Sequence, residues 1–581
     1  MKQAAPHPFR FSIPLLAFTA IFFYSSCLKA QPLHGPKKFT KQDTLRGSLT
    51  PERAWWNVTH YNIQVTPDFN TQTIRGWNQL SFDVANPDGK SRIMQIDLQQ
   101  PMQLDSVWLE GGTTGNKAPI SFRRNGSVFY LDFPGKLLEQ YGNQVITTAG
   151  KTKNYSLRLY FSGKPRKAVT PPWDGGWIWA RDDKGRPWMS VACQGLGASV
   201  WYPCKDYQGD EPDSGAMLQV RVPDTLVAVA NGKLYSEDDQ QDGTKLWTWE
   251  VKNPINNYNI VPYIGKYVHF SDTYIGETEK NLSLDYWVLD YELPKAKKQF
   301  DRDVKRMLKA FEYWFSPYPF YEDGYKLVES PHLGMEHQSA TAYGNHFLDG
   351  YLGSDLSGSG WGLKWDYIIV HESGHEWFGN SITTRDIADM WVHEGFTMYS
   401  EPLFIEYYYG KKAADAYVQG IRNNISNDIP IIGPYDVNQE GSGDMYNKGA
   451  NMLHTIRQVI NNDSLFRSIL RSLNTKFYHR VTTSAEVEQL ISKESGIDFS
   501  KVFDQYLRTV MIPELQYKIA GNKLQVRWSN VVKGFAMPVR LQDGSWVKPT
   551  TQWTTLPLPA TVKAKGLEAD KNFYVTVKAV K

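Results

Sequence analysis

Cysteine is scarce in this chain, which has 3 among its 581 residues. This excludes a disulfide-dense scaffold, the kind on which small secreted domains depend. Cys193 and Cys204 lie in the body of the chain. They can pair with each other or remain two buried thiols, and the sequence leaves both alternatives open.

An excess of one charge is also missing, because 64 basic and 61 acidic residues leave a formal net charge of +3. We therefore expect no nucleic-acid partner. Long apolar runs are missing as well. After residue 24, no segment offers the roughly 18 consecutive apolar residues that a membrane-spanning helix needs. The sequence therefore predicts no transmembrane span.

One shorter apolar segment lies at the N-terminus, over residues 11–24. Basic residues precede it and Ala30 ends a small-residue cleavage site, which is typical of a signal peptide over residues 1–30. This predicts export, to the periplasm, the medium or a membrane anchor. Processing as a lipoprotein with a lipid anchor at Cys27 is the alternative, and simple secretion is favoured because Tyr24 fits poorly before such a cysteine.

The periodicity of the chain changes along its length, and 581 residues exceed a single core. Residues 31–50 are polar and lysine-rich, which favours a flexible linker. Residues 51–267 alternate and predict one large N-terminal β domain. Residues 268–512 follow a helical period and predict a mostly helical domain. Residues 513–581 return to alternation and predict a small C-terminal β-sandwich, so the fold class is multidomain α+β.

Individual elements follow from the same patterns. Alternation predicts strands at His60–Val65, Ser156–Tyr160, Leu218–Val222, Leu515–Ile519, Leu524–Trp528 and Phe573–Val577. Helical periodicity predicts helices at Lys295–Phe315, Thr397–Tyr409, Ala413–Asn424, Asn451–Asn461, Leu465–Leu473 and Ser484–Ser495. The Gly/Ser-rich segment Gly353–Gly360 is either a mobile rim or a spacer.

The pentapeptide His371-Glu372-Ser373-Gly374-His375 carries the clearest chemistry. Two histidines one helical turn apart share a face and can reach one ion. With Glu394 they form the two-histidine, one-carboxylate set of a catalytic zinc, whose fourth position stays open. Glu372 follows the first ligand and is placed to take a proton from water. We therefore predict one Zn²⁺ per chain, held by His371, His375 and Glu394. The alternative is a core helix with merely buried histidines.

Further segments extend this motif: Gly334–His337, Trp391–Phe396 and Tyr446–Ala450. Together with the zinc motif they resemble the zinc aminopeptidase family of aminopeptidase N and leukotriene hydrolase, the gluzincin metallopeptidases. Within the β domain, Cys193–Gly195 and Tyr202–Asp206 are similar to the leukotriene hydrolase branch. The resemblance spans residues from about 190 to 450 in the family's order.

The resemblance implies a thermolysin-like catalytic domain and a role for each matching residue. Glu336 and Gln194 are expected to hold the free α-ammonium of a peptide through charge-assisted bonds. Gly334 and Met335 are expected to line the peptide as an extended strand, since glycine allows a close approach. Tyr446 is expected to stabilise the oxyanion.

Glu401 follows Glu394 by two helical turns and is expected to orient a zinc-bound histidine, with Asp389 as the alternative. Two residues depart from the family pattern: His337 stands after Glu336, and His393 stands before Glu394, where asparagine is usual. Neither is a ligand in that pattern, so they bear on substrate preference more than on metal binding.

The sequence thus predicts a secreted zinc aminopeptidase that hydrolyses the N-terminal residue of peptides with a free N-terminus. Two alternatives stay open. One is a different zinc hydrolase, an endopeptidase or an epoxide hydrolase, and the other is a non-catalytic peptide-binding protein. Many family members carry a large helical C-terminal domain, whereas residues 513–581 here are β-like. We therefore expect an open site with little constraint on peptide length.

Overall fold

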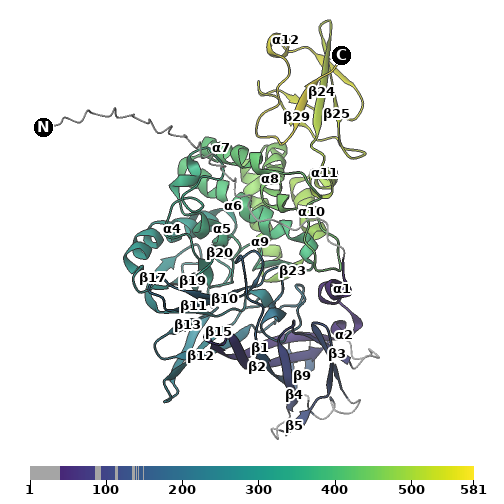
Figure 1. Cartoon of the computed structure of the whole chain (residues 1–581). Helices are drawn as coiled ribbons and strands as arrows, with labels where there is room; N and C mark the ends of the chain where they lie inside the picture. Colours follow the sequence, from purple (N-terminus) through teal and green to yellow (C-terminus); the bar gives the residue numbers. More distant parts are fainter. Residues whose placement is uncertain are drawn as a thin grey trace, which may run out of the picture.

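The computed structural model describes residues 39–85, 93–111, 116–133, 138, 141, 143–147 and 150–581. A β-rich N-terminal part, a layer of helices and a C-terminal pair of sheets follow one another (Figure 1). This confirms the predicted α+β fold class. None of the helices in the described ranges has the length and apolarity of a membrane span. The signal segment and Cys27 lie outside the described residues, so export and lipidation stay predictions.

A nine-stranded sheet forms the body of the N-terminal domain. Strand β1 has the alternating burial of a strand with one face on the core. Its residues Tyr61, Ile63 and Val65 are fully buried, while the residues between them are half-exposed. In spatial order the strands are β14 (Lys233–Asp239), β15 (Thr244–Val251), β12 (Ala216–Pro223), β1 (Trp56–Asp68), β2 (Thr73–Val84), β9 (Gly150–Gly163), β4 (Gln103–Gly111) and β5 (Asn116–Pro119), with β8 (Asn143–Thr147) paired to β9.

A smaller sheet leads into the loop that contains Gln194, the residue of this domain that is predicted to bind substrate. Its order is β10 (Gly176–Arg181), β11 (Pro187–Ala192), β16 (Tyr263–Gly265) and β13 (Val227–Val229). Gln194 lies in the loop after β11. Asp206 accepts hydrogen bonds from the backbone amides of Ala198 and Ser199, both at 3.2 Å, and so fixes the end of this loop. Cys193 and Cys204 are both buried free thiols, which settles that alternative.

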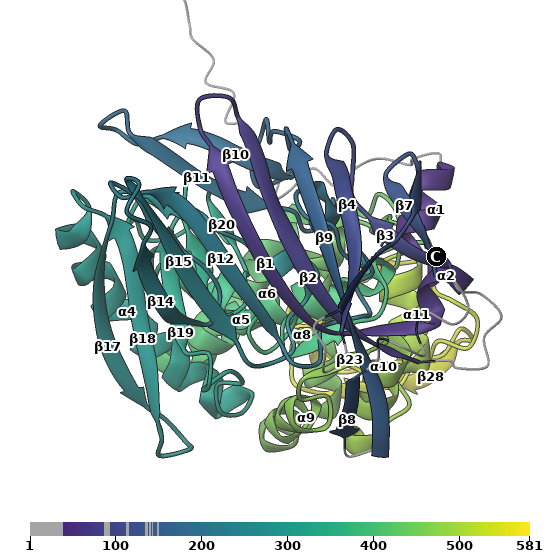
Figure 2. The ribbon, with the colours of Figure 1, turned by 90° about the horizontal axis from the view of Figure 1, so that it is seen from below.

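The catalytic domain combines helices with a five-stranded sheet. The sheet order is β17 (Tyr267–Ile275), β18 (Asn281–Leu289), β19 (Tyr325–Glu329), β21 (Thr341–Tyr343) and β20 (Gly334–Met335), so β20 is an edge strand. Its helices include α4 (Leu293–Trp314), α5 (Tyr367–Gly374), α6 (Trp391–Tyr409) and α8 (Asn447–Ile460). Figure 2 shows strands β1 and β2 in front of α5, α6 and α8. Hydrogen bonds join the two domains, such as the one from Asn231 Nδ2 to the carbonyl oxygen of Gln338 at 2.7 Å.

All six predicted helices are confirmed, and all but α10 have shifted ends. The helix expected at Lys295–Phe315 is α4, the one expected at Asn451–Asn461 is α8, and further matches are α7 (Lys411–Ile421), α9 (Asp463–Lys476) and α10 (Ser484–Ser495). Helix α6 begins at Trp391 rather than Thr397, because tertiary burial of its first turn outweighs the weak propensity of Gly395. The sequence missed α11 (Ser500–Arg508), which has nine residues and no side-chain cap at Phe499.

The linker predicted over residues 31–50 is wrong in part, because helix α1 occupies Lys41–Gly47. A capping box that includes Asp43 satisfies its first turn. The backbone amide of Asn438 donates to Asp43 O at 3.1 Å. A Cβ on Gly47 would lie 2.3 Å from the Asn438 nitrogen, so only glycine fits there. The segment is therefore tied to the loop that leads to Tyr446.

The C-terminal residues form a four-stranded sheet and a two-stranded one. The larger has the order β28 (Thr554–Pro557), β25 (Lys523–Ser529), β24 (Glu514–Ala520) and β29 (Thr576–Ala579), and the smaller pairs β26 (Val539–Arg540) with β27 (Trp546–Val547). The strand expected at Phe573–Val577 begins three residues late. Tyr574 instead bonds to the catalytic helices, with its amide 3.0 Å from Thr455 Oγ1 and its carbonyl 2.7 Å from Tyr506 Oη.

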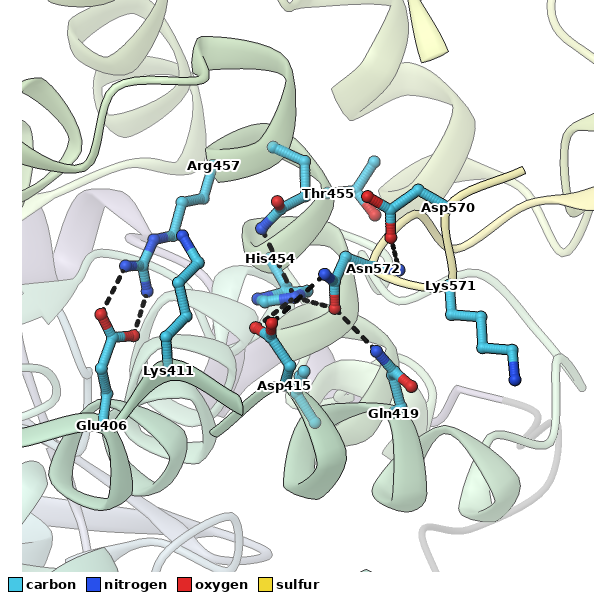
Figure 3. Close-up of polar contacts among 12 residues, drawn as sticks. Glu406, Lys411, Asp415, Gln419, His454, Thr455, Arg457, Asp570, Lys571 and Asn572 are labelled. Carbon is cyan, nitrogen blue, oxygen red and sulfur yellow. Dashed lines mark hydrogen bonds and ion pairs between the residues drawn. The ribbon is translucent and has the colours of Figure 1, made fainter. Parts of the chain in front are cut away.

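A buried polar cluster joins this C-terminal module to α7 and α8 (Figure 3). Asn572 Oδ1 lies 3.1 Å from His454 Nε2 and accepts a bond of 2.7 Å from Gln419. His454 Nδ1 lies 3.0 Å from the hydroxyl of Tyr399 on α6. Burial lowers the pKa of His454 to about 3, so the ring is neutral and can donate through one nitrogen and accept through the other. The module is thus hydrogen-bonded to the helices behind the site.

Candidate active site

Helix α5 presents the predicted zinc motif. Asp366 caps it by accepting hydrogen bonds from the amides of Ile368 and Ile369, at 3.1 and 3.4 Å. His371 and Glu372 lie in its last turn, and His375 is its C-terminal cap. Burial raises the pKa of Asp366 to about 7, although the side chains that donate hydrogen bonds to this carboxylate act to lower it. One buried carboxylate therefore sets where the motif helix begins.

The three predicted ligands converge. Glu394 Oε2 lies 3.3 Å from His375 Nε2 and 3.9 Å from His371 Nε2. All three side chains are nearly or fully buried, with exposed fractions of 5% for His371, 1% for His375 and 2% for Glu394. Their ligand atoms lie within 4.8 Å of one another. The fold has thus brought α5 and α6 together at one point.

These separations fit a metal ion better than a hydrogen-bonded cluster. Bonds of about 2.0–2.2 Å to one tetrahedral ion would place ligand atoms roughly 3.3–3.6 Å apart. Glu394 Oε2 is buried without a hydrogen-bond partner among the described residues, as a coordinating oxygen would be. Burial lowers the pKa of His371 to about 3, so this ring is neutral, as a ligand must be. The donor set is therefore that of a catalytic zinc site.

The negative charge around His375 also favours a bound cation. Burial disfavours a protonated His375, yet the carboxylates of Glu394 and Glu336 outweigh it and raise the pKa of His375 to about 10. A second candidate group contains Glu336, Glu372 and His375. It shares His375 with the first but supplies one histidine only. We assign the ion to His371, His375 and Glu394 because zinc favours nitrogen ligands.

The remaining ring nitrogens of both histidines have orienting partners. His371 Nδ1 lies 2.7 Å from Glu401 Oε1, and Tyr417 donates to the other oxygen of Glu401 at 2.6 Å. His375 Nδ1 lies 3.0 Å from the carbonyl oxygen of Phe378. These bonds leave each Nε2 directed at the ligand cluster. The structure thus places Glu401, and not Asp389, beside a ligand.

Asp389 has a different set of contacts. It accepts hydrogen bonds from the hydroxyl of Tyr435 at 2.6 Å and from the amide of Ser484 at 3.0 Å. It therefore links α10 to the start of α6 rather than orienting a histidine.

We expect Glu401→Gln to weaken zinc binding by about 10- to 100-fold, because the amide cannot hold His371 with a charge-assisted bond. Competition with a chromophoric chelator measures the zinc dissociation constant. Glu237→Gln is the matched control, since Glu237 pairs with Lys245 at the protein surface. An unchanged zinc dissociation constant in Glu401→Gln would contradict the orienting role.

The predicted ammonium-binding carboxylate lies beside this cluster. Glu336 is 3% exposed, and its Oε1 accepts hydrogen bonds from Gln194 Nε2 and, at 2.8 Å, from the hydroxyl of Tyr258. Both bonds go to one oxygen, so Oε2 is left for a ligand. The backbone carbonyl of Glu336 accepts from Asn380 Nδ2 at 2.9 Å. The carboxylate is therefore held in place before any substrate arrives.

The edge strand β20 leads directly into Glu336. A Cβ on Gly334 would lie 2.7 Å from Glu372 Oε1 and 2.9 Å from Ile368 Cδ1, so glycine is required where the strand passes the base. Glu372 is half-buried, unlike the ligands. Burial, with the carboxylates of Glu336 and Glu394, raises its pKa well above the usual range. A raised pKa suits a carboxylate that takes up and releases a proton near neutrality.

Tyr446 completes the arrangement from the start of α8. Its ring stacks near the His371 ring, with centroids 6.1 Å apart and planes at 25°. Its hydroxyl hydrogen-bonds Glu394. Burial acts to raise the pKa of that carboxyl, but His375, His371 and the Tyr446 hydroxyl together outweigh burial and lower it. Burial raises the pKa of Tyr446 well above its usual value, so the phenol stays protonated and can donate. The structure thus brings together all the site residues that the sequence predicted.

Sequence reasoning missed Tyr258 and Asn380, which hold Glu336. The signal for Tyr258 is its place in Asn256-Asn257-Tyr258-Asn259, a polar run buried inside a β domain. The two departing histidines turn out to be structural. His337 Nδ1 bonds the hydroxyl of Tyr263, and His393 Nε2 accepts from the amide of Thr384 at 2.9 Å.

Comparison with known proteins agrees with this geometry. The Peptidase M1 N-terminal domain matches residues 57–258, and the Peptidase family M1 domain matches residues 299–506. The chain belongs to peptidase family M1. Leucine aminopeptidase 2 of Vanderwaltozyma polyspora is 23% identical over 73% of this chain, and aminopeptidase B of Rattus norvegicus is 25% identical over 65% of it. The chain spans 60% and 54% of the length of these two M1 relatives.

A solved structure shares the fold. The M1 zinc metallopeptidase of Deinococcus radiodurans aligns with a TM-score of 0.62 at 19% identity, covering 79% of this chain and 95% of the other. A variant of the same enzyme, solved with a Tyr-Ser-Ala substrate, aligns with a TM-score of 0.63. At this identity the likeness shows the M1 fold alone.

Proposed function

We propose that this M1 peptidase is a zinc aminopeptidase that removes the N-terminal residue of peptides. One observation carries the proposal: a buried carboxylate, Glu336, is held by Gln194 and Tyr258 beside the three-ligand cluster. A carboxylate at this point binds a free α-ammonium and fixes how far the chain extends past the base. An endopeptidase has no free α-ammonium to bind at this point.

Each residue has a part in this proposal. A zinc ion bound by His371, His375 and Glu394 would supply a Lewis acid for the peptide carbonyl and for water. Glu336 Oε2 and the amide oxygen of Gln194 accept hydrogen bonds from the α-ammonium. The free edge of β20 pairs with the peptide backbone, as in β-strand addition.

The proton transfers belong to Glu372, which lies beside Gly334 at the level of the first peptide bond. It takes a proton from the attacking water and delivers it to the departing amine. The hydroxyl of Tyr446 donates to the oxygen that gains negative charge. Burial raises the pKa of both side chains, so the phenol of Tyr446 keeps the proton that it donates.

Blocking the N-terminus tests the proposal. We expect the zinc-loaded enzyme to hydrolyse aminoacyl coumarin amides and to lose about 100-fold or more in kcat/KM on their N-acetyl forms, because acetylation leaves Glu336 buried without its ion pair. Chelation should abolish the activity, and added zinc should restore it. Equal rates on free and acetylated substrates would indicate an endopeptidase, and zinc binding without turnover of either would indicate a peptide-binding protein.

A further inference from the structure

The loop between β21 and α5, residues 345–364, lies beside the site and has no role in the chemistry above. The pairing of the edge strand β20 with β21 sets the point at which the loop leaves the sheet. Gly334 pairs with Tyr343 on the inner side of β20, and the amide of Gly344 donates to Leu333 O at 2.7 Å. The loop therefore leaves the sheet at the Gly334 end of β20, opposite the Glu336 end.

This end is where the second residue of a bound peptide would lie. A peptide with its ammonium at Glu336 that pairs with β20 must run from Glu336 toward Gly334. The base Glu372 is beside Gly334, so the first peptide bond lies there. The residues after the scissile bond then continue toward the start of the loop.

Buried hydrogen bonds build the loop in a fixed shape. Asn345 is fully buried; its Nδ2 donates to the carbonyls of Leu348 and Gly350, at 2.8 and 2.9 Å, and its Oδ1 accepts from Leu352 N at 2.8 Å. Reciprocal backbone bonds join Tyr351 to Ser354, at 2.9 and 3.0 Å. These bonds set the course of residues 345–354 beside the site. The two alternatives for Gly353–Gly360, a mobile rim and a spacer, both stay predictions.

The loop also holds strained backbone. His346, Phe347 and Leu352 adopt φ of 53°, 59° and 49°, in the left-handed region that side chains other than glycine disfavour. Leu352 and Gly353 (φ 83°) form the two central residues of a tight turn with both φ values positive. Strain of this kind persists only where surrounding contacts enforce it, and it concentrates at ligand sites.

Three of the side chains that the loop exposes are leucines. Leu348, Leu352 and Leu363 are 44%, 40% and 43% exposed. The acidic side chains of the loop are occupied elsewhere: Asp349 pairs with Arg302, and Asp355 accepts from the amide of Ser357 at 2.9 Å. His346 and Lys364 of the loop are exposed as well, so the three leucines are the large apolar side chains at this rim but not its only exposed ones.

Tyr351 connects the rim to the metal ligands. Its ring meets the Tyr367 ring edge-on, with centroids 5.2 Å apart, and Tyr367 stacks on His371 at 5.0 Å and 14°. Burial and then the carboxylate of Glu372 raise the pKa of Tyr351 to about 12, which agrees with a place on the Glu372 side of the site. A half-buried aromatic ring thus stands next to the base at the end where the peptide leaves.

We propose that residues 345–364 form the wall of the subsite for the second residue of the peptide, with Tyr351 and Leu352 selecting an apolar or aromatic side chain there. This inference rests on the aminopeptidase function proposed above. Tyr351 and Leu352 act on specificity: they contact the part of the substrate that becomes the released peptide, and they take no part in proton transfer.

The test compares dipeptide amides that differ only at the second position, Xaa-Phe-amide and Xaa-Gly-amide, where Xaa is the residue that the wild type removes fastest. We expect the wild type to favour the phenylalanine substrate by about 10-fold or more in kcat/KM, the range that burial of one apolar side chain gives. Tyr351→Ala and Leu352→Gly should each reduce this ratio by about 5-fold or more, through KM.

Leu352→Gly guards against misfolding, because glycine adopts the left-handed conformation without strain and the side chain is exposed. Tyr235→Ala, at an exposed position on β14, is the control and should keep the wild-type ratio. If the wild type hydrolyses the dipeptide amides but both loop variants keep the wild-type ratio, the subsite inference alone is overturned. If the zinc-loaded wild type hydrolyses neither substrate, the proposed function fails and the inference falls with it.

Discussion

Glu372→Gln is expected to reduce kcat by about 100- to 10,000-fold, the range that a positioned general acid–base supplies. The amide has the shape of the carboxylate but cannot take a proton from water or deliver one to the amine. Zinc should stay bound, since the three ligands and their orienting partners are unchanged. Turnover with saturating substrate, together with zinc content per chain, measures both effects.

The fold should tolerate this change. Burial raises the pKa of Glu372, and the charges of the nearby Glu336 and Glu394 carboxylates raise it further. Replacing it by a neutral amide removes that repulsion, so the melting temperature should not fall. Glu322→Gln, at an exposed position of the same domain, is the control and should keep wild-type kcat. Wild-type turnover by zinc-loaded Glu372→Gln would remove Glu372 from the mechanism.

Glu336→Gln is expected to have the next largest effect, and on one class of substrate only. On peptides with a free N-terminus, kcat/KM should fall by about 100- to 1,000-fold, because the α-ammonium loses a buried charged partner. The amide oxygen can still accept from Gln194 and Tyr258, so the local structure is kept. On N-acetylated peptides, whose rates start low, the same variant should change little.

The ratio of the two substrates makes this test specific. In the wild type it measures the preference for a free N-terminus, and in Glu336→Gln it should approach one. A variant that lowered both rates equally would instead indicate general damage to the site. Glu279→Gln, at an exposed turn between β17 and β18, should leave the ratio at its wild-type value.

Local sequence predicted the elements of the fold well where the pattern was long. Helix α10 occupies the residues that periodicity predicted. The structure shows why its ends fall there, because Thr483 and Glu486 form a capping box and Gly496 ends the helix in the left-handed conformation. Patterns failed where a long-range contact decided the outcome. Helix α1 forms although its sequence is polar, because it packs on the loop at Asn438.

The same distinction holds for the site. A helical repeat places His371 and His375 on one face, so the spacing alone predicted two ligands. Glu401 was predicted by its distance of two turns from Glu394 on one helix. Tyr258 was missed because it lies on a 3-10 turn of another domain, and no local pattern relates it to Glu336.

The sequence by itself predicted zinc, its three ligands and the base. The spacing of His371, Glu372 and His375 is local to one helix, whereas Glu394 lies on a second helix that only the fold brings beside them. It also fixed the succession of β, helical and β domains through hydrophobic period. Tertiary structure decided the rest: how Glu336 is held by Gln194 and Tyr258, which carboxylate orients His371, and where the strained rim at Tyr351 stands relative to β20. These depend on contacts between residues far apart in the chain, and no local pattern encodes such distances.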